Sequence, residues 1–144
     1  MSEKKLPIQF TLIYIEDNQF STFDEMLNVD KPIEQQVGFG FGVDIERNVI
    51  AVAVDFIFQK EKKPLLKQNV TCYFEISSED FDTQLRKEKE VVLPCWFGKH
   101  LAMLTTGTAR GILFANTKNT PFNKYIIGLI NVDKMFDEDI HIAI

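Results

Sequence analysis

The fold is decided by residues 37–76, which read VGFGFGVDIERNVIAVAVDFIFQKEKKPLLKQNVTCYFEI. Apolar side chains alternate with small or polar ones in three segments of this stretch, residues 37–45, 50–58 and 69–76. A period of two is typical of strands that bury one face, and the intervening residues are of types that turn a chain. We therefore expect three consecutive antiparallel strands.

A further strand is predicted upstream. Residues 8–15 read IQFTLIYI, a β-branched and aromatic run, and the polar residues 16–18 interrupt it with a turn or bulge. Residues 22–34 show no sustained period and contain Pro32, so they predict a connection, and its length is typical of functional loops. The four strands, taken in chain order, predict an antiparallel meander sheet.

The character of the sequence changes after the fourth strand. Residues 77–90 are charged, and Ser78 is a candidate N-cap for a short helix or loop. Large apolar and small side chains recur at three- and four-residue steps over residues 95–117, which predicts a long helix that begins after Pro94. Asn119-Thr120-Pro121 ends it.

The remaining residues add little regular structure. Residues 125–130 predict a short extended apolar run, and residues 131–144 a stub of helix and a tail. We expect one α+β domain over residues 1–144, in which the four-stranded antiparallel sheet packs against the long helix.

Two glycines four residues apart lie inside the predicted helix. Each costs a helix about 1 kcal/mol relative to alanine, so the pair indicates that a neighbouring backbone packs against that face. Packing of the helix on the sheet or a contact between subunits would both explain it. The candidate oligomer-interface residues are Leu104, Gly107, Thr108 and Gly111.

Gly38, Gly40 and Gly42 form one face of the second predicted strand, where another group can approach the backbone closely. A nucleotide-binding loop is not indicated, because the dinucleotide fingerprint needs G-x-G-x-x-G at the start of a helix, whereas more strand follows here.

Charge and hydropathy disfavour several classes of partner. The formal net charge of −5 argues against unspecific binding to nucleic acid or anionic membrane. No stretch approaches the roughly 20 apolar residues of a membrane span, and no run of signal-peptide length follows residues 1–5, so we expect a soluble cytoplasmic protein. The one basic cluster predicts a solvated hairpin end around Pro64; it comprises Lys60, Lys62, Lys63 and Lys67.

Few groups are available for catalysis or metal binding. The two histidines and two cysteines lack metal-ligand spacing, and we interpret both cysteines as small buried apolar residues. Asp17 and Glu75 lie on predicted strands that could be neighbours, which leaves open either a paired-carboxylate site or two solvated acids. We expect a protein that is not an enzyme and that holds no cofactor or metal.

Short motifs along the chain follow a known family pattern. Those in the sheet are Ile8-Gln9-Phe10 through Ile13-Tyr14, then Asp17 and Phe20, and Glu75-Ile76. Those that follow are Ala109-Arg110, Thr120-Pro121 and Asn131-Val132-Asp133-Lys134-Met135-Phe136. Together with the order of elements, these motifs resemble the SecB family of bacterial export chaperones over nearly the whole chain.

The resemblance implies helices on one side of the sheet and a homotetramer built as a dimer of dimers, with the glycine-bearing helix in the subunit contact. It also implies that client polypeptides lie extended in apolar grooves beside the loop after strand one. In this sequence the candidate groove residues are Phe23, Met26, Leu27, Val29 and Ile33. An alternative is that these side chains pin the loop to the protein's own core.

SecB-like proteins dock the translocase motor SecA through an acidic face of the sheet. Asp17 and Glu75 match two of those positions, which implies SecA docking. Ser21, however, stands where the family usually has a second acid, and the chain stops soon after Ile140.

The 13 phenylalanines supply more apolar ring surface than a core of this size needs. With the resemblance, they predict an ATP-independent holdase that binds unfolded or nascent polypeptides, with an implied role in export. The alternative is a dedicated protein-interaction module, such as an antitoxin-type chaperone for one partner.

Overall fold

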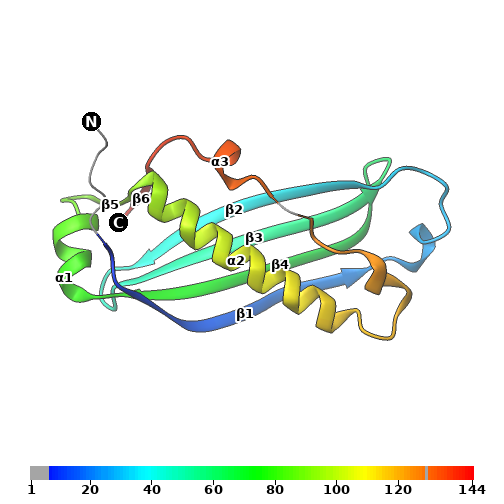
Figure 1. The fold of residues 1–144 in the computed structure, drawn as a ribbon, viewed down its shortest axis with the longest axis horizontal. Helices are drawn as coiled ribbons and strands as arrows, with labels where there is room; N and C mark the ends of the chain where they lie inside the picture. Colours follow the sequence, from blue (N-terminus) through cyan, green and yellow to red (C-terminus); the bar gives the residue numbers. More distant parts are fainter. Residues whose placement is uncertain (1–6, 129) are drawn as a thin grey trace.

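The computed structural model describes residues 7–128 and 130–144, and in it a four-stranded antiparallel sheet is crossed on one face by a long helix (Figure 1). The sheet strands are β1 (Phe10–Thr22), β2 (Glu34–Asp44), β3 (Val49–Lys60) and β4 (Lys63–Ile76). The other elements are η1 (Asp24–Met26), α1 (Ser78–Asp80), η2 (Phe81–Leu85), β5 (Glu90–Leu93), α2 (Cys95–Asn116), η3 (Pro121–Lys124), α3 (Val132–Met135) and β6 (Ile140–Ala143). Residues 1–6, where the predicted absence of a leader begins, lie outside the described residues, as does one residue of the 125–130 run.

The strand order corrects the predicted meander. β2, β3 and β4 are neighbours in chain order, but β1 pairs with β4 at the far edge, giving the order β1-β4-β3-β2. The chain must therefore cross three strand spacings, about 14 Å, between β1 and β2. This is why residues 23–33, which we call the strap, form a long connection, whereas the β3–β4 turn needs only Glu61 and Lys62.

The alternating pattern places side chains on the inner and outer faces of the sheet as predicted. Val52, Val54 and Phe74 are fully buried on the face that α2 covers, and Ala51 and Tyr73 lie on the outer face. β1 carries two bulges, between Leu12 and Tyr14 and between Asp17 and Gln19; the second confirms the predicted interruption.

The long helix is confirmed, because α2 spans Cys95–Asn116 where residues 95–117 were expected. Pro94 precedes it, and its buried face includes Leu101, Ala109 and Leu113. Thr105 and Thr106 are also buried, since their hydroxyls donate to the carbonyls of the preceding turn at 2.8 Å and leave no polar atom unpaired.

The space between the sheet and α2 holds two clusters of buried side chains. The first core lies at the α1 end and includes Phe74, Phe81, Leu85, Val91, Leu93, Phe97 and Leu101. The second core lies toward the strap and includes Met26, Phe56, Phe58, Leu65, Leu113, Phe122 and Tyr125.

The elements that cover the first core, namely α1, η2, β5 and β6, were predicted only in part. Ser77, not the predicted Ser78, caps α1, with its hydroxyl accepting from the Asp80 amide at 3.3 Å. Phe81 and Leu85 then point inward from η2 and are fully buried. β5 and β6 pair as a two-stranded sheet that the sequence did not indicate.

Candidate functional site

The strap packs on the second core. Met26 is only 7% exposed, and Phe23, Leu27 and Val29 are half-buried against the same cluster. Ile33, in contrast, is 43% exposed. In this arrangement four of the five candidate groove residues pin the strap to the protein's own core, which was the open alternative. Binding of a client there stays a prediction.

Lys60 corrects the prediction of a solvated hairpin end. It is the last residue of β3, pairs with Lys63, and is only 5% exposed. Its ammonium donates to three strap carbonyls, those of Met26 at 2.9 Å, Leu27 at 3.2 Å and Val29 at 3.0 Å. An ammonium has three donors, so these three bonds satisfy a buried charge without a carboxylate.

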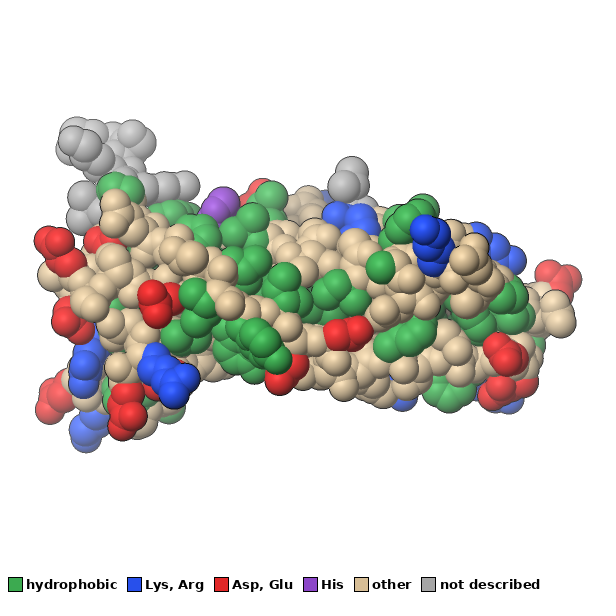
Figure 2. Space-filling view, turned by 90° about the horizontal axis from the view of Figure 1, so that it is seen from below, with side chains coloured by type: hydrophobic (Ala, Val, Ile, Leu, Met, Phe, Trp, Pro, Cys, Tyr) green, Lys and Arg blue, Asp and Glu red, His purple; other side chains and the backbone are tan. Residues whose placement is uncertain are grey.

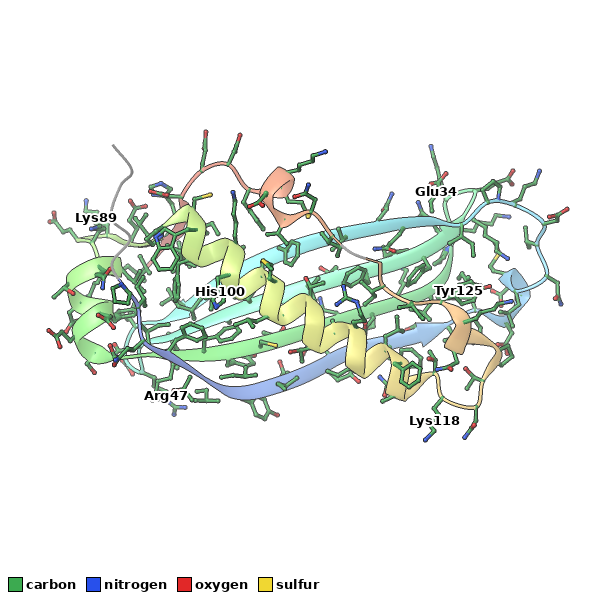
Figure 3. The ribbon with its side chains drawn as sticks, in the orientation of Figure 1. Glu34, Arg47, Lys89, His100, Lys118 and Tyr125 are labelled. Carbon is green, nitrogen blue, oxygen red and sulfur yellow. The ribbon has the colours of Figure 1, made fainter. Side chains whose placement is uncertain are left out.

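A second cation ties down another cover of the same core. The Arg110 guanidinium donates from Nε to the Ile127 carbonyl at 2.8 Å and from Nη2 to the Gly128 carbonyl at 3.1 Å. These bonds hold the chain after η3, where the Tyr125 ring packs 6.0 Å from that of Phe58. Tyr125 lies at the end of the molecule where Glu34 and Lys118 also lie (Figure 3).

The glycine-bearing face of α2 points away from the sheet. Gly107 and Gly111 are exposed, and a Cβ added at either would meet nothing within 4 Å. Packing on the sheet therefore does not explain them. The same face exposes Met103 at 59%, Leu104 at 40% and Phe114 at 56%. Of the predicted interface residues, only Thr108 is half-buried, with its hydroxyl bonded to the Leu104 carbonyl at 2.9 Å. Contact with another subunit stays a prediction.

β1 exposes apolar side chains that sequence reasoning did not single out. Leu12, Ile13, Tyr14 and Ile15 are between 41% and 59% exposed, and Phe20 is 36% exposed. Successive residues of a strand point to opposite faces, so an apolar run of four leaves both faces of this edge strand apolar. Seen from below, hydrophobic side chains form a broken band along this side of the molecule (Figure 2). In the sequence, the unbroken apolar run of residues 12–15 was the signal for these exposed side chains.

α2 crosses the sheet obliquely, and its two ends reach β1 (Figure 1). The Asn116 side chain donates to the Asp17 carboxylate at 2.9 Å, and the Phe10 and His100 rings pack edge-on at 5.7 Å. We call the exposed apolar side chains of the two elements the apolar band, of which Ile13 and Tyr14 lie on the outer face of the sheet, opposite α2. Its members are Leu12, Ile13, Tyr14, Ile15, Phe20, Met103, Leu104 and Phe114.

The outer face of the sheet carries the predicted glycine face. Gly38 would meet nothing within 4 Å with an added Cβ, so no close approach is made to it within the described residues. A shallow pocket of about 400 Å³ also lies here, and its lining includes Tyr14, Tyr73, Asp44 and Arg47.

Asp17 and Glu75 do not come together. Asp17 pairs with Val70 on β4, five residues before Glu75, so the two carboxylates point to opposite faces of the sheet. Asp17 faces α2, as its bond with Asn116 requires. A paired-carboxylate site and a single acidic docking face containing both residues are therefore wrong.

The other reactive groups are dispersed. Cys72 is buried as expected, and Cys95 is half-buried with Sγ 3.7 Å from the Phe136 carbonyl. His100 lines an aromatic pocket with Phe10 and Trp96, and His141 contacts Glu90 at 3.1 Å. Within residues 7–128 and 130–144, no group of three or more His, Cys, Asp or Glu side chains could hold a metal ion.

Three groups have shifted pKa values, each from a local cause. Burial raises the pKa of the Cys72 thiol. The hydrogen bond from the Tyr73 hydroxyl to Glu16 raises the pKa of Tyr73. The pKa of Asp80 is lowered, mainly by the hydrogen bond from the Gln9 amide and then by that from the Ser77 hydroxyl. None of these groups lies in the second core.

The fold and these surfaces define an α+β protein with a four-stranded antiparallel sheet, one long helix and an exposed apolar band. No protein-family model, curated protein or solved structure matches it. None of the helices formed by the described residues has the length and hydropathy to cross a membrane.

Proposed function

We propose that this protein is an ATP-independent chaperone that holds apolar segments of unfolded or nascent polypeptides. The observation that carries the proposal is the β1 part of the apolar band, in which consecutive large side chains such as Leu12, Ile13 and Ile15 are exposed. Scattered apolar residues are normal on a surface, but an exposed run of them on an edge strand is typical of a site for another polypeptide.

The chemistry of the apolar band suits clients of many sequences. Burial of apolar side chains is non-directional, and each one buried contributes about 1.5 to 3 kcal/mol. Several such contacts give useful affinity after the cost of ordering an unfolded chain.

The test is suppression of aggregation. At a stoichiometric ratio of assembled chaperone to chemically unfolded client, light scattering should be strongly reduced in the absence of ATP. Replacing Ile13 and Ile15 together with glutamine should weaken suppression several-fold. The control pair, Thr11→Gln with Thr22→Gln, changes two exposed residues of the same strand and should suppress as the wild type does. Unchanged scattering with the wild-type protein would overturn the proposal.

We further propose that the glycine-bearing face of α2 is covered by a second copy within an oligomer, in line with the homotetramer that the resemblance implies. Two glycines four residues apart let another helix approach closely, while Leu104 and Phe114 supply apolar contact beside them. Because a Cβ added at Gly107 would meet nothing within 4 Å among the described residues, Gly107→Leu should lower the solution mass and leave the circular dichroism spectrum unchanged. An unaltered mass would place the interface elsewhere.

A partner-specific chaperone is the second candidate, and the free edge of β1 favours it. Within the described part of the chain β1 pairs only with β4, so its other edge can accept a strand from a partner. Affinity capture from the native host distinguishes the two functions, since one dominant partner favours this candidate and a mixture of unfolded chains favours the holdase.

A further inference from the structure

The strap has few polar attachments to the rest of the molecule. At its start, the Phe23 amide donates to the Leu65 carbonyl at 3.0 Å. Beyond that point, the polar contacts between described strap residues and other elements come from two neighbouring residues at the tip of the β3–β4 hairpin. Lys60 bonds three strap carbonyls, and Glu61 forms an exposed ion pair with Lys31 at 3.4 Å.

The three Lys60 bonds form and break as one unit. The Met26 and Leu27 carbonyls lie at the end of η1, and the Val29 carbonyl follows within the same turn of chain. If the Lys60 ammonium withdraws, all three carbonyls lose this hydrogen-bond donor, and the buried charge loses its three acceptors. The strap therefore has one well-defined closed position. The Lys31–Glu61 pair, in which both side chains are at least half exposed, adds little to it.

Apolar surface lies on both sides of this contact. Beneath the strap, the second core presents Phe58 and Leu65 from the sheet and Phe122 from η3. The strap itself contributes Met26, with Phe23 and Leu27 packed beside it. Displacement of the strap would thus open a furrow with two apolar walls, and closure hides both.

We propose that the strap is a hinged cover over a client-binding furrow, and that the Lys60 contact with the Met26, Leu27 and Val29 carbonyls holds it closed. Phe23 is the hinge, because its amide bond to Leu65 lies outside the Lys60 contact. The inference rests on the proposed function and deepens it. The β1 part of the apolar band is available to clients in either position of the strap, whereas the furrow becomes available only when the strap opens. An extended apolar segment of the client then takes the place of the strap.

Hydrogen exchange tests the latch without any client. Lys60→Met keeps the apolar stem and removes all three donors. The amides of Met26, Leu27 and Val29, which are bonded within the strap, should exchange roughly 10- to 100-fold faster in this variant. Amides of β3 such as that of Val54 should not change. The matched control is Lys62→Met, which removes an exposed lysine from the same hairpin and should leave strap exchange as in the wild type.

Binding tests the furrow separately. Fluorescein-labelled β-casein, a largely unfolded protein, should bind Lys60→Met several-fold more tightly than Lys62→Met. Equal strap exchange in the two variants would overturn the latch. Faster exchange with unchanged binding would overturn the furrow as a client site, even if the apolar band still suppresses aggregation.

A wild-type measurement covers the case in which Lys60→Met does not fold. At low denaturant concentration, strap amides should exchange through a local opening while β3 amides remain protected. Exchange of strap and β3 amides as one cooperative unit would overturn the proposal.

Discussion

The two cores are covered in different ways. Over the first core, η2 and the β5–β6 pair are closed by main-chain hydrogen bonds, and Phe81, Leu93 and Phe97 fill the space beneath them completely. Over the second core, the strap and the chain after η3 are loops, tied by the side chains of Lys60 and Arg110. Both covers pack against the same sheet and helix (Figure 1).

From this difference we infer that the cover of the first core maintains the fold, whereas the cover of the second core can move. A strand ladder is lost only when several main-chain bonds break together, so its cover opens with the whole domain. A loop held by one side chain can open while the sheet stays intact. The second core is therefore the region where this domain can expose apolar surface at the smallest cost.

The largest effect is expected in the first core. Phe97→Ala removes a fully buried ring from α2 that packs edge-on against Phe10, and the main-chain-bonded cover cannot collapse into the space. We expect a loss of about 4 kcal/mol in the free energy of unfolding, measured by urea denaturation. All spectroscopic probes should report one transition. A loss below about 2 kcal/mol would show that the first core relaxes as easily as the second.

Met26→Ala is the matching change in the second core. Met26 is nearly buried, but it belongs to a strap that can settle toward the sheet when the side chain is shortened. We expect a loss of about 2 kcal/mol, the low end of the range for such truncations. Exchange of strap amides should increase without a comparable change in β3. If the loss equals that of Phe97→Ala, the two covers do not differ.

Sequence patterns predicted the helix and strands whose positions are determined by residues close together in the chain. α2 was predicted to within one residue, because Pro94 and Asn119-Thr120-Pro121 are local signals. The alternation of β2, β3 and β4 was equally local. The pairing of β1 with β4, and of β5 with β6, joins segments far apart in the chain, and four-residue strands are too short to show a period.

Burial of Lys60 was beyond prediction for a related reason. The residues that follow Lys60 in the sequence are charged residues and a proline, which indicate exposure to solvent, while the carbonyls that surround its ammonium come from the strap. The prediction that Asp17 and Glu75 share a face failed for a similar reason, since the bulges and the edge position of β1 decide which face Asp17 occupies relative to Glu75 on β4. The groove residues Phe23 and Met26 were identified as apolar, and their packing on the protein's own core was one of the two alternatives that the sequence left open.

Gln68 allows a smaller test, which asks whether a buried side-chain amide without hydrogen-bond partners destabilises the sheet. Its side chain is 2% exposed, and neither amide atom has a hydrogen-bond partner within the described structure. It lies between Phe20 and Phe56 on the neighbouring strands. Because an unpaired buried amide is costly, Gln68→Leu should raise the free energy of unfolding by about 1 kcal/mol.

Gln59 is the control for that change. It is also nearly buried, but its amide donates to the Glu34 carboxylate at 3.3 Å. Gln59→Leu should therefore lower the free energy of unfolding, measured by the same urea titration. Equal effects of the two substitutions would show that pairing of the amide does not decide the outcome.

The smallest effect is expected at Asp80, and it distinguishes the two covers by pH. Its carboxylate accepts from the Gln9 amide and the Ser77 hydroxyl, and these bonds lower its pKa in the folded protein below the ordinary value of 3.8. A lowered pKa means that the carboxylate stabilises the fold above pH 3.8 and that this contribution is lost as the pH falls through the folded-state value. Asp80→Asn should therefore lower the urea midpoint at pH 7, with an effect that shrinks as the pH falls below 3.8. Asp82→Asn, at an exposed neighbour, should have little effect across this range. The Lys60 and Arg110 contacts use only carbonyl acceptors, so strap exchange should not follow the titration of Asp80. If it does, the two covers are coupled and do not open independently.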